Sequence, residues 1–287
     1  MSKEKPKHQQ SIEIPKPILF TAKVAQFISK KAATNFAMKL FMTPMKHRMP
    51  SRELEMDTKS EQVLVTIPAI KKDVMVYHYG KSDKKILLVH GWSGRGTQLV
   101  KIADEFLKLG YSTVSFDAPA HGKSSGKTSH MREFVQTILH LQQLYGPFEY
   151  AVGHSLGGMA LLNAVKRGLV LHKLVVIGSG DVVEDILNDF VLKLQMKLTI
   201  AAEMKVQLEK RLGETLNSYS AYIASEEVPI PVLVIHDEDD HDVPVSAAHH
   251  IYEHLKDGQL MITKSLGHRK ILGDSKVIER IVKFIKN

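Results

Sequence analysis

The sequence predicts an α/β fold, in which a mostly parallel central sheet carries helices on both faces. Two observations lead to this fold class. Short continuous apolar runs recur along the chain, at residues 86–89, 112–116, 150–152, 173–177 and 232–235. Stretches in which apolar residues keep helical spacing separate these runs. Runs that are apolar on both faces and alternate with helices are typical of a parallel sheet that is covered on both sides.

The N-terminal segment reads differently. Residues 1–16 are polar, charged and interrupted by prolines, and we expect them to be disordered. In residues 18–42, apolar residues recur at roughly helical spacing and lysines recur every seven residues along one face. This pattern predicts one basic amphipathic helix or two short ones, ended by Pro44 and Pro50.

Two further segments complete the predicted fold. Residues 63–67 and 74–79 alternate between apolar and polar and are rich in β-branched residues, which favours antiparallel strands at a sheet edge. The last two of the five apolar runs are 54 residues apart, more than one crossover helix needs. We therefore expect residues 181–228 to be an insertion of two or three helices. Residues 260–263 form the last predicted strand.

The net charge of +8 is unevenly distributed over the 287 residues. Residues 1–52 hold 11 Lys or Arg and 2 Asp or Glu, whereas the remaining 28 basic and 29 acidic residues nearly cancel. We therefore divide the chain into a basic N-terminal arm, residues 1–52, and a neutral body, residues 53–287. An enzyme acting on nucleic acid would carry its positive charge around the site of chemistry. We expect no nucleic-acid partner.

Composition excludes several other classes. The chain has no cysteine, so disulfide scaffolds, thiolate metal sites and cysteine nucleophiles are excluded. No apolar run approaches the ~20 residues that span a bilayer, and lysines interrupt every candidate signal-peptide core. We therefore predict a cytoplasmic protein, in which the basic arm is the segment suited to peripheral contact with a membrane.

A G-x-S-x-G motif at Gly153–Gly157 directly follows a predicted strand and precedes a helix-forming run. This is the pattern of a nucleophile elbow, in which Ser155 sits on a sharp, strained turn with its Oγ above the sheet. Glycines flank the serine because larger side chains would collide with the neighbouring strand and helix. The alternative is a Gly-rich turn without chemistry, which the placement after a strand disfavours.

A serine nucleophile needs donors for the oxyanion that forms when it attacks a carbonyl. An H-G-x-x-G turn begins at His90 and closes the first parallel strand, and it predicts the backbone N–H of Trp92 as one donor. The second donor is the N–H of Leu156, at a helix N-terminus whose dipole favours negative charge. We expect His90 itself to pack within the turn.

The loop from Asp117 onwards reads D-A-P-A-H-G-K-S. Together with the two motifs above, it makes the chain resemble the α/β-hydrolase superfamily, whose members often carry D-x-P-G-H-G-x-S at this position. Ala120 replaces the usual Gly. Asp117 and His121 look like partners for a catalytic serine, but both precede Ser155, and the order in this superfamily is Ser, acid, His. We interpret both as structural residues.

Residues 236–244 resemble the superfamily's H-G-x-x-D-x-x-V-P acid loop. Aligning the Val-Pro end of the motif selects Asp240 as the acid, with Asp242 as its rival. Asp237 replaces the usual Gly. A solvated loop and a metal site using the loop's histidines and carboxylates are the alternatives for this acidic run. Hydrolases of this pattern need no metal, so we expect neither a metal nor another cofactor.

The predicted base is His268, which lies in a Gly-containing loop after the last strand and 28 residues beyond Asp240. The order Ser155, Asp240, His268 is then complete. Each residue follows the carboxyl end of a predicted strand, where open α/β sheets bind their ligands.

The resemblance covers residues 84–287. It implies an α/β-hydrolase fold with an eight-stranded, mostly parallel sheet and with the insertion at residues 181–228 as a helical cap. It also implies that His268 takes the proton of Ser155, that Asp240 fixes the imidazole tautomer, and that water cleaves the acyl-enzyme.

We therefore expect a serine hydrolase that acts on a small-molecule carboxylic ester, with a thioesterase or amidase as the next alternatives. A hypothesis from another class is a membrane-surface or lipid-binding module that works through the arm at residues 1–52. The arm could instead be a helix docked on the body. The sequence leaves the oligomeric state open.

Overall fold

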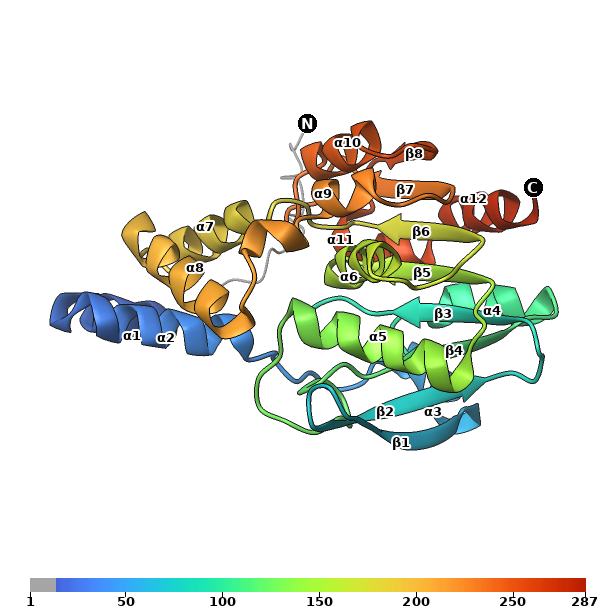
Figure 1. Cartoon of the computed structure of the whole chain (residues 1–287), viewed down its shortest axis with the longest axis horizontal. Helices are drawn as coiled ribbons and strands as arrows, with labels where there is room; N and C mark the ends of the chain where they lie inside the picture. The colour runs from blue at the N-terminus through green and yellow to red at the C-terminus, as the bar shows by residue number, and fades with distance from the viewer. Residues whose placement is uncertain (1–13) are drawn as a thin grey trace, which may run out of the picture.

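A computed structural model describes residues 14–287, so most of the segment that the sequence predicts to be disordered lies outside the described residues. Figure 1 shows a central sheet flanked by helices and a helical lobe to one side of it. The α/β fold class predicted from the sequence is confirmed.

One eight-stranded sheet runs through the body, in the order β1-β2-β4-β3-β5-β6-β7-β8. Its strands are β1 (Glu61–Ile67), β2 (Lys72–Tyr79), β3 (Lys85–Val89), β4 (Ser112–Phe116), β5 (Tyr150–His154), β6 (Lys173–Ile177), β7 (Val232–Asp237) and β8 (Gly258–Thr263). β2 runs antiparallel to both β1 and β4, and every other neighbouring pair is parallel. The mostly parallel sheet and its antiparallel edge are as predicted.

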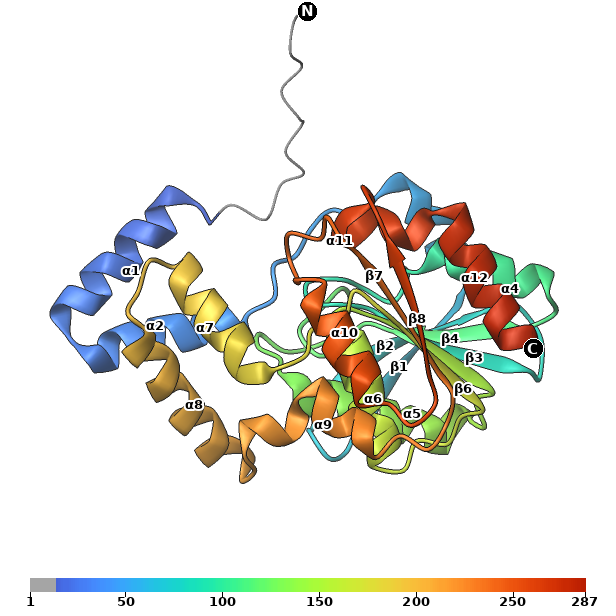
Figure 2. The ribbon, with the colours of Figure 1, turned by 90° about the horizontal axis from the view of Figure 1, so that it is seen from above.

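Helices cover both faces of the sheet (Figure 2). One face carries α5 (Met131–Tyr145), α6 (Leu156–Lys166), α9 (Ala221–Glu226) and α10 (Ser246–Glu253), and the other carries α3 (Leu54–Lys59), α4 (Val100–Lys108) and α12 (Ser275–Lys286). Short helical turns are η1 (Ser51–Glu53), α11 (Gly267–Lys270) and η3 (Ile271–Gly273). Leu87 and Val89 of β3 pack towards the first face, and Ile86 and Leu88 towards the second, so the strand is apolar throughout.

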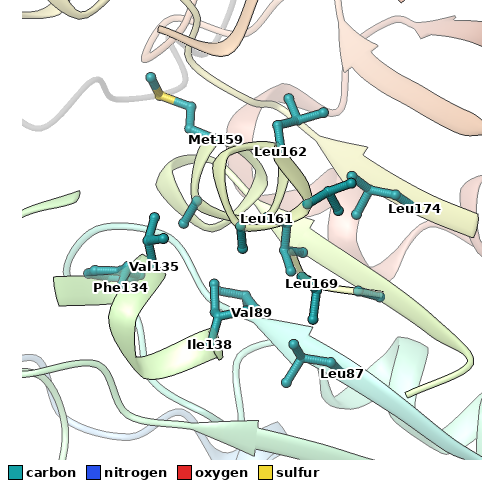
Figure 3. Packing of buried hydrophobic residues seen from close by; sticks show 14 of the residues in the cluster. Leu87, Val89, Phe134, Val135, Ile138, Met159, Leu161, Leu162, Leu169 and Leu174 are labelled. Atoms are coloured by element: carbon teal, nitrogen blue, oxygen red, sulfur yellow. The ribbon is translucent and has the colours of Figure 1, made fainter. Parts of the chain in front are cut away.

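The helix that follows the serine motif is buried along almost its whole length. Residues 157–165 of α6 are all buried, because the helix is covered by neighbouring helices as well as by the sheet. Figure 3 shows Leu161 directed towards Val89 and Ile138 within this cluster. A helix that is buried on all sides cannot shift without losing close packing, which fixes the place of its N-terminal turn.

The residues between β6 and β7 form the predicted helical insertion. It contains α7 (Val183–Lys193), α8 (Leu198–Leu212) and η2 (Leu216–Tyr219), followed by α9. In Figure 1, α7 and α8 lie beyond the carboxyl ends of the parallel strands. At the base of the insertion, Asp181 pairs with His250 of α10 and accepts the N–H of Tyr222 at 2.8 Å. These contacts fasten the insertion to the body.

The described part of the arm forms two helices rather than one, α1 (Lys16–Ile28) and α2 (Lys30–Met42). The break occurs at Ser29, whose side chain accepts the N–H of Ala32 at 3.1 Å and so caps α2. Buried side chains of α1 and α2 share one apolar cluster with α7 and α8. Between residues 14 and 287, no helix has both the length and the apolar character needed to cross a bilayer.

The loop after β4 explains one departure from the superfamily's usual motif. Ala120 is buried and has a φ of +66°, in the left-handed region where glycine is favoured. Its N–H donates to the carbonyl oxygen of Ser125 at 2.8 Å, so the loop holds this conformation without glycine. The left-handed backbone at Ala120 is therefore strained by the presence of the alanine methyl group.

We expect Ala120→Gly to raise the free energy of unfolding by about 0.5–1 kcal/mol, because relief of left-handed strain exceeds the entropic cost of glycine. Urea denaturation measures this change. Ala118→Gly is the matched control, since Ala118 is equally buried but has no positive φ, and this variant should be destabilised. A similar loss of stability in both variants would contradict the strain at Ala120.

Candidate active site

Ser155 lies in the turn between β5 and α6, with φ of 54° and ψ of −123°. This is a backbone conformation that side-chain-bearing residues rarely adopt, and it persists only where the surroundings impose it. The Ser155 N–H donates to the carbonyl oxygen of Ile177 at 2.9 Å, and its own carbonyl accepts the N–H of Gly158 at 3.0 Å. The sharp turn expected from the sequence motif is therefore present.

The glycines of the motif are required by close backbone contacts. A Cβ on Gly153 would lie 2.6 Å from the carbonyl oxygen of Gly157, and a Cβ on Gly157 would overlap the carbonyl oxygens of Val89 and His90. Backbone atoms cannot move away as a flexible side chain can. The turn therefore stands directly against the end of β3.

The two N–H groups predicted to stabilise an oxyanion belong to residues that line the same cavity as Ser155. Leu156 is the first residue of α6, and Trp92 lies in the turn after β3. Neither N–H has a hydrogen-bond partner within residues 14–287. His90 shapes the turn, since its Nδ1 donates to the carbonyl of Gly91 at 2.6 Å and its Nε2 accepts the N–H of Ala118 at 2.9 Å.

Asp240 contacts His268, with 2.7 Å between its Oδ2 and the imidazole Nδ1. The other carboxylate oxygen accepts the N–H groups of Asp242 and Val243, at 2.8 and 2.9 Å. Burial alone would raise the pKa of Asp240, but the hydrogen bond and electrostatic interaction with His268, together with the Val243 N–H, lower it below its ordinary value. Asp240 is therefore a carboxylate in contact with the imidazole of His268.

The rival acid, Asp242, is placed differently. Its backbone N–H donates to Asp240, and within the described chain its carboxylate makes no hydrogen bond or ion pair with His268. The alignment of the Val-Pro end of the loop therefore selected the aspartate that the structure brings to His268.

His154, the residue before the serine, contacts His268, the predicted base. The two imidazole rings are 4.6 Å apart, and the Nε2 of His154 donates to the backbone carbonyl of His268 at 2.8 Å. Burial, with the nearby His268 as a smaller cause, holds the pKa of His154 well below its ordinary value, so this ring is neutral. Sequence analysis missed this contact, because the variable positions of a G-x-S-x-G motif carry no signal for it.

Asp237, the residue in place of the usual Gly, connects the acid loop to the start of α11, the short helix that carries His268. Its carboxylate accepts the N–H groups of Leu266 and Gly267, at 3.1 and 2.9 Å, and the hydroxyl of Thr263 at 2.7 Å. It also accepts the N–H of Asp239 at 3.0 Å. Burial would raise the pKa of Asp237, but these hydrogen bonds lower it. The departure from the motif was the available signal for this role.

In residues 14–287, Asp117 and His121 make their polar contacts with residues other than Ser155. The Asp117 carboxylate accepts the N–H of Gly96 at 2.7 Å, the hydroxyl of Tyr77 at 2.9 Å and the N–H of Lys123 at 2.6 Å. Burial lowers the pKa of His121 to about 3, so its ring stays neutral. This geometry agrees with a structural role for both.

A metal site was the alternative for the acidic loop at residues 236–244. Its buried His236 donates to the carbonyl of Val243 at 3.0 Å and lies 3.4 Å from Asp240. In the part of the chain that the structure describes, no three His, Cys, Asp or Glu side chains are arranged to hold a metal ion. The expectation of no metal stays a prediction.

A cavity of about 830 Å³ opens beside the serine. Ser155, Leu156 and Trp92 line one side of it, α7 and α8 of the insertion contribute apolar side chains, and α2 of the arm contributes Leu40 and Phe41. A smaller cavity of about 170 Å³ is lined by His268. Asp242 lines both cavities, so they lie next to each other.

Residues 86–274, which contain Ser155, Asp240 and His268, match a model of the alpha/beta hydrolase family. The chain belongs to the alpha/beta hydrolase family. No curated protein sequence matches it significantly.

Solved structures similar to this hydrolase include an esterase from Pyrococcus furiosus, with a TM-score of 0.65, 17% identity and coverage of 85% of this chain and 97% of the esterase. An esterase from Exiguobacterium antarcticum has a TM-score of 0.61 and 16% identity, over 79% of this chain and 100% of the other. A bromoperoxidase from Bacillus anthracis has a TM-score of 0.60 and 18% identity over the same shares. At such identities the similarity shows the fold alone.

The Asp237 network of this hydrolase should contribute stability that depends on pH. The folded state lowers the pKa of Asp237, so the contribution is present above the unfolded value of about 3.9 and is lost as pH falls through the lower folded value. We expect Asp237→Asn to cost about 1–3 kcal/mol of unfolding free energy at pH 7. The difference should begin to shrink as the pH falls below about 4, and it should vanish only below the folded pKa of Asp237, where both folded proteins lack the charge.

Urea denaturation of both proteins at pH 7, about 5, about 3.5 and about 2 measures this difference on both sides of the transition. Glu238→Gln is the control, because Glu238 is exposed and its ion pair with Lys264 contributes at most about 1 kcal/mol. A difference between parent and Asp237→Asn that stays constant down to the lowest pH would contradict the role assigned to the charge.

Proposed function

We propose that this hydrolase cleaves carboxylic esters with a large apolar acyl group, through an acyl-enzyme on Ser155. The observation that carries the proposal is the pairing of Asp240 with His268, whose ring lies 4.6 Å from that of His154, the residue before the serine on its strained turn. Nucleophile, base and acid in this chain order are the arrangement of serine catalysis on an α/β sheet. Esterases among the proteins of similar fold agree with the choice of an ester.

In the proposed reaction, the Nε2 of His268 accepts the proton of the Ser155 hydroxyl as the serine oxygen attacks the ester carbonyl. The Nδ1 of His268 keeps its proton, because it donates to the Asp240 carboxylate, and the positive imidazolium is stabilised by that charge. The proton then passes to the departing alcohol. Water, deprotonated by the same imidazole, cleaves the acyl-enzyme and regenerates the serine.

The negative oxygen of the tetrahedral intermediate needs donors that are already in place. The N–H groups of Trp92 and Leu156 support this role, because both residues line the cavity beside Ser155 and neither N–H is used elsewhere in residues 14–287. The N-terminus of α6 adds the favourable end of the helix dipole.

The size and lining of the cavity support an apolar acyl group. A volume of about 830 Å³ lies in the range that encloses a whole small-molecule ligand. Its wall away from the serine is formed by side chains such as Phe41, Phe190 and Leu208, from the arm and the insertion. An acyl chain lying against them is removed from water, whereas an acetyl group would leave most of this wall uncovered.

Ser155→Ala should lower kcat for a p-nitrophenyl ester by at least about 10⁴-fold, because the nucleophile is lost. Asp240→Asn should approach this loss by leaving His268 in the wrong tautomer. Asp242→Asn is the matched control in the same loop, and we expect less than about a threefold change. Stopped-flow or steady-state release of p-nitrophenol measures all three variants. Full activity of Ser155→Ala would sink the proposed mechanism.

Matched oxygen ester, thioester and anilide substrates with one acyl chain separate the esterase from the thioesterase and amidase alternatives. A proline iminopeptidase from Mycobacterium smegmatis, with a TM-score of 0.59 and 15% identity over 79% of this chain and 98% of the peptidase, is among the similar folds, so the amide arm is informative. The ester should have the highest kcat/KM. A higher value for the thioester or anilide would reassign the substrate class and leave Ser155 as nucleophile.

The cavity wall makes a second prediction about acyl length. Phe190→Ala should lower kcat/KM for a p-nitrophenyl octanoate about 5- to 30-fold and change the acetate value less than about twofold, since only the longer chain reaches this side chain. Leu192→Ala on the same helix is the control, because Leu192 is 54% exposed and does not line the cavity. An unchanged octanoate-to-acetate ratio with a lower melting temperature would place Phe190 in the core instead.

A further inference from the structure

Helix α1 presents an apolar face to solvent, formed by Phe20, Val24, Phe27 and Ile28. The exposed fractions of these side chains are 70%, 40%, 93% and 68%. Spacings of three and four residues place all four on one side of the helix. We call this surface the α1 apolar face.

The opposite side of α1 is the one that packs on the protein. Ala22 is fully buried and Ile18 is half-buried, both in the cluster shared with α2 and the insertion. Gln26 accepts the backbone N–H of Lys197 at 2.8 Å, which fixes the end of α1 against the loop before α8. The α1 apolar face is therefore held outward, and Figure 2 shows α1 at the outer end of the helical lobe, away from the sheet.

Phenylalanines this exposed are unusual on a protein surface. Singly exposed apolar residues need no explanation, but a contiguous apolar face commonly marks a binding surface. Phe27 has the largest exposed fraction of the large apolar side chains in residues 14–287. None of the four side chains belongs to the buried cluster under the helix. Packing of that cluster therefore does not explain why these positions are apolar.

Positive charge surrounds the α1 apolar face. Residues 14–52 contain no Asp or Glu, and their basic residues are Lys16, Lys23, Lys30, Lys31, Lys39, Lys46, Arg48 and Arg52. On the helix, Lys16 and Lys23 lie beside the apolar face, and Lys30 and Lys31 follow at the start of α2. Within the described residues, Lys30 pairs with Glu203, whereas Lys16, Lys23 and Lys31 make no ion pair.

We propose that the α1 apolar face docks on the surface of an anionic lipid bilayer. The phenylalanines enter the boundary between headgroups and acyl chains, and the lysines extend their ammonium groups to the lipid phosphates. A helix of 13 residues is about 20 Å long, too short for the ~30 Å hydrocarbon core, so α1 lies in the plane of the surface.

Charge complementarity selects the bilayer over a second copy of this chain. A symmetric dimer through the α1 apolar face would place Lys16 and Lys23 of both copies side by side in a partly desolvated interface. An anionic surface instead neutralises the same lysines. The excess of lysine and arginine in the arm favours contact with phosphate-rich surfaces. The body, residues 53–287, has no such excess.

Co-sedimentation of the intact protein with vesicles tests the proposal. The vesicles contain phosphatidylcholine with or without about one-third phosphatidylglycerol, at roughly 50 and roughly 500 mM sodium chloride. We expect binding to the anionic vesicles at low salt, with a loss of at least about 10-fold in partition coefficient on pure phosphatidylcholine or at high salt. The measurement does not depend on the activity of Ser155.

Two pairs of variants locate the contact. Phe20→Ser with Phe27→Ser should weaken binding at least about 10-fold, because two apolar side chains no longer leave water. Leu64→Ser with Val170→Ser is the matched control, since both residues are highly exposed but lie on the body, and binding should not change. Lys16→Gln with Lys23→Gln should weaken binding roughly 10-fold at low salt, whereas Lys256→Gln with Lys276→Gln should not.

Circular dichroism shows whether the variants keep the parent melting temperature, as their exposure predicts. Equal binding by the parent and the phenylalanine variant would overturn the proposal. So would absence of binding to anionic vesicles together with a dimer, detected by sedimentation velocity, that the phenylalanine variant loses. The latter result would make the α1 apolar face a contact between two copies.

Discussion

The close approach of Gly157 to the end of β3 is the constraint on which the site depends. Without a side chain at this position, α6 begins directly against the carbonyl oxygens of Val89 and His90. The serine turn, the first N–H of α6 and the turn after β3 are thereby held within one small region. The burial of α6 prevents the helix from relieving the strain at Ser155 by shifting. The position of Ser155 therefore depends on core packing through the backbone contact at Gly157.

Elsewhere along the carboxyl edge of the sheet, hydrogen bonds hold His268 in position. His268 lies in the short helix α11, where the sequence predicted a loop, and this single turn lacks the extensive burial of α6. Its backbone is held by His154, its ring by Asp240, and the residues before it by Asp237. These three partners come from β5, β7 and the loop after β7. A helical turn held by groups from separate strands keeps its position only as long as the sheet register is correct.

The parts of the fold that sequence predicted are those determined by local patterns. The apolar runs of β3 to β7, the helical insertion and the motif around Ser155 each carry a signal within a few residues. Asp240 was chosen over Asp242 because the Val-Pro end of the loop sets the register, and the structure brings Asp240 to His268. The proposed roles of these residues await the kinetic variants.

Features that depend on contacts between distant segments could not be predicted in this way. The His154 ring reaches a carbonyl 114 residues away, and no local pattern encodes that distance. The carboxylate of Asp237 and the left-handed backbone of Ala120 were visible only as departures from a familiar motif. Sequence also could not show that Leu40 and Phe41, from the N-terminal arm, line the cavity beside Ser155. The cytoplasmic location stays a prediction.

The shared core of the arm and the insertion has a consequence for how the chain folds. Gln26 meets Lys197 across 171 residues of sequence, and Lys30 meets Glu203 across 173. During synthesis from the N-terminus, the arm therefore leaves the ribosome long before the helices that cover it exist. Its apolar side chains must wait in contact with water or a chaperone until the insertion is made. The first helices of this chain to be synthesised are among the last to be buried.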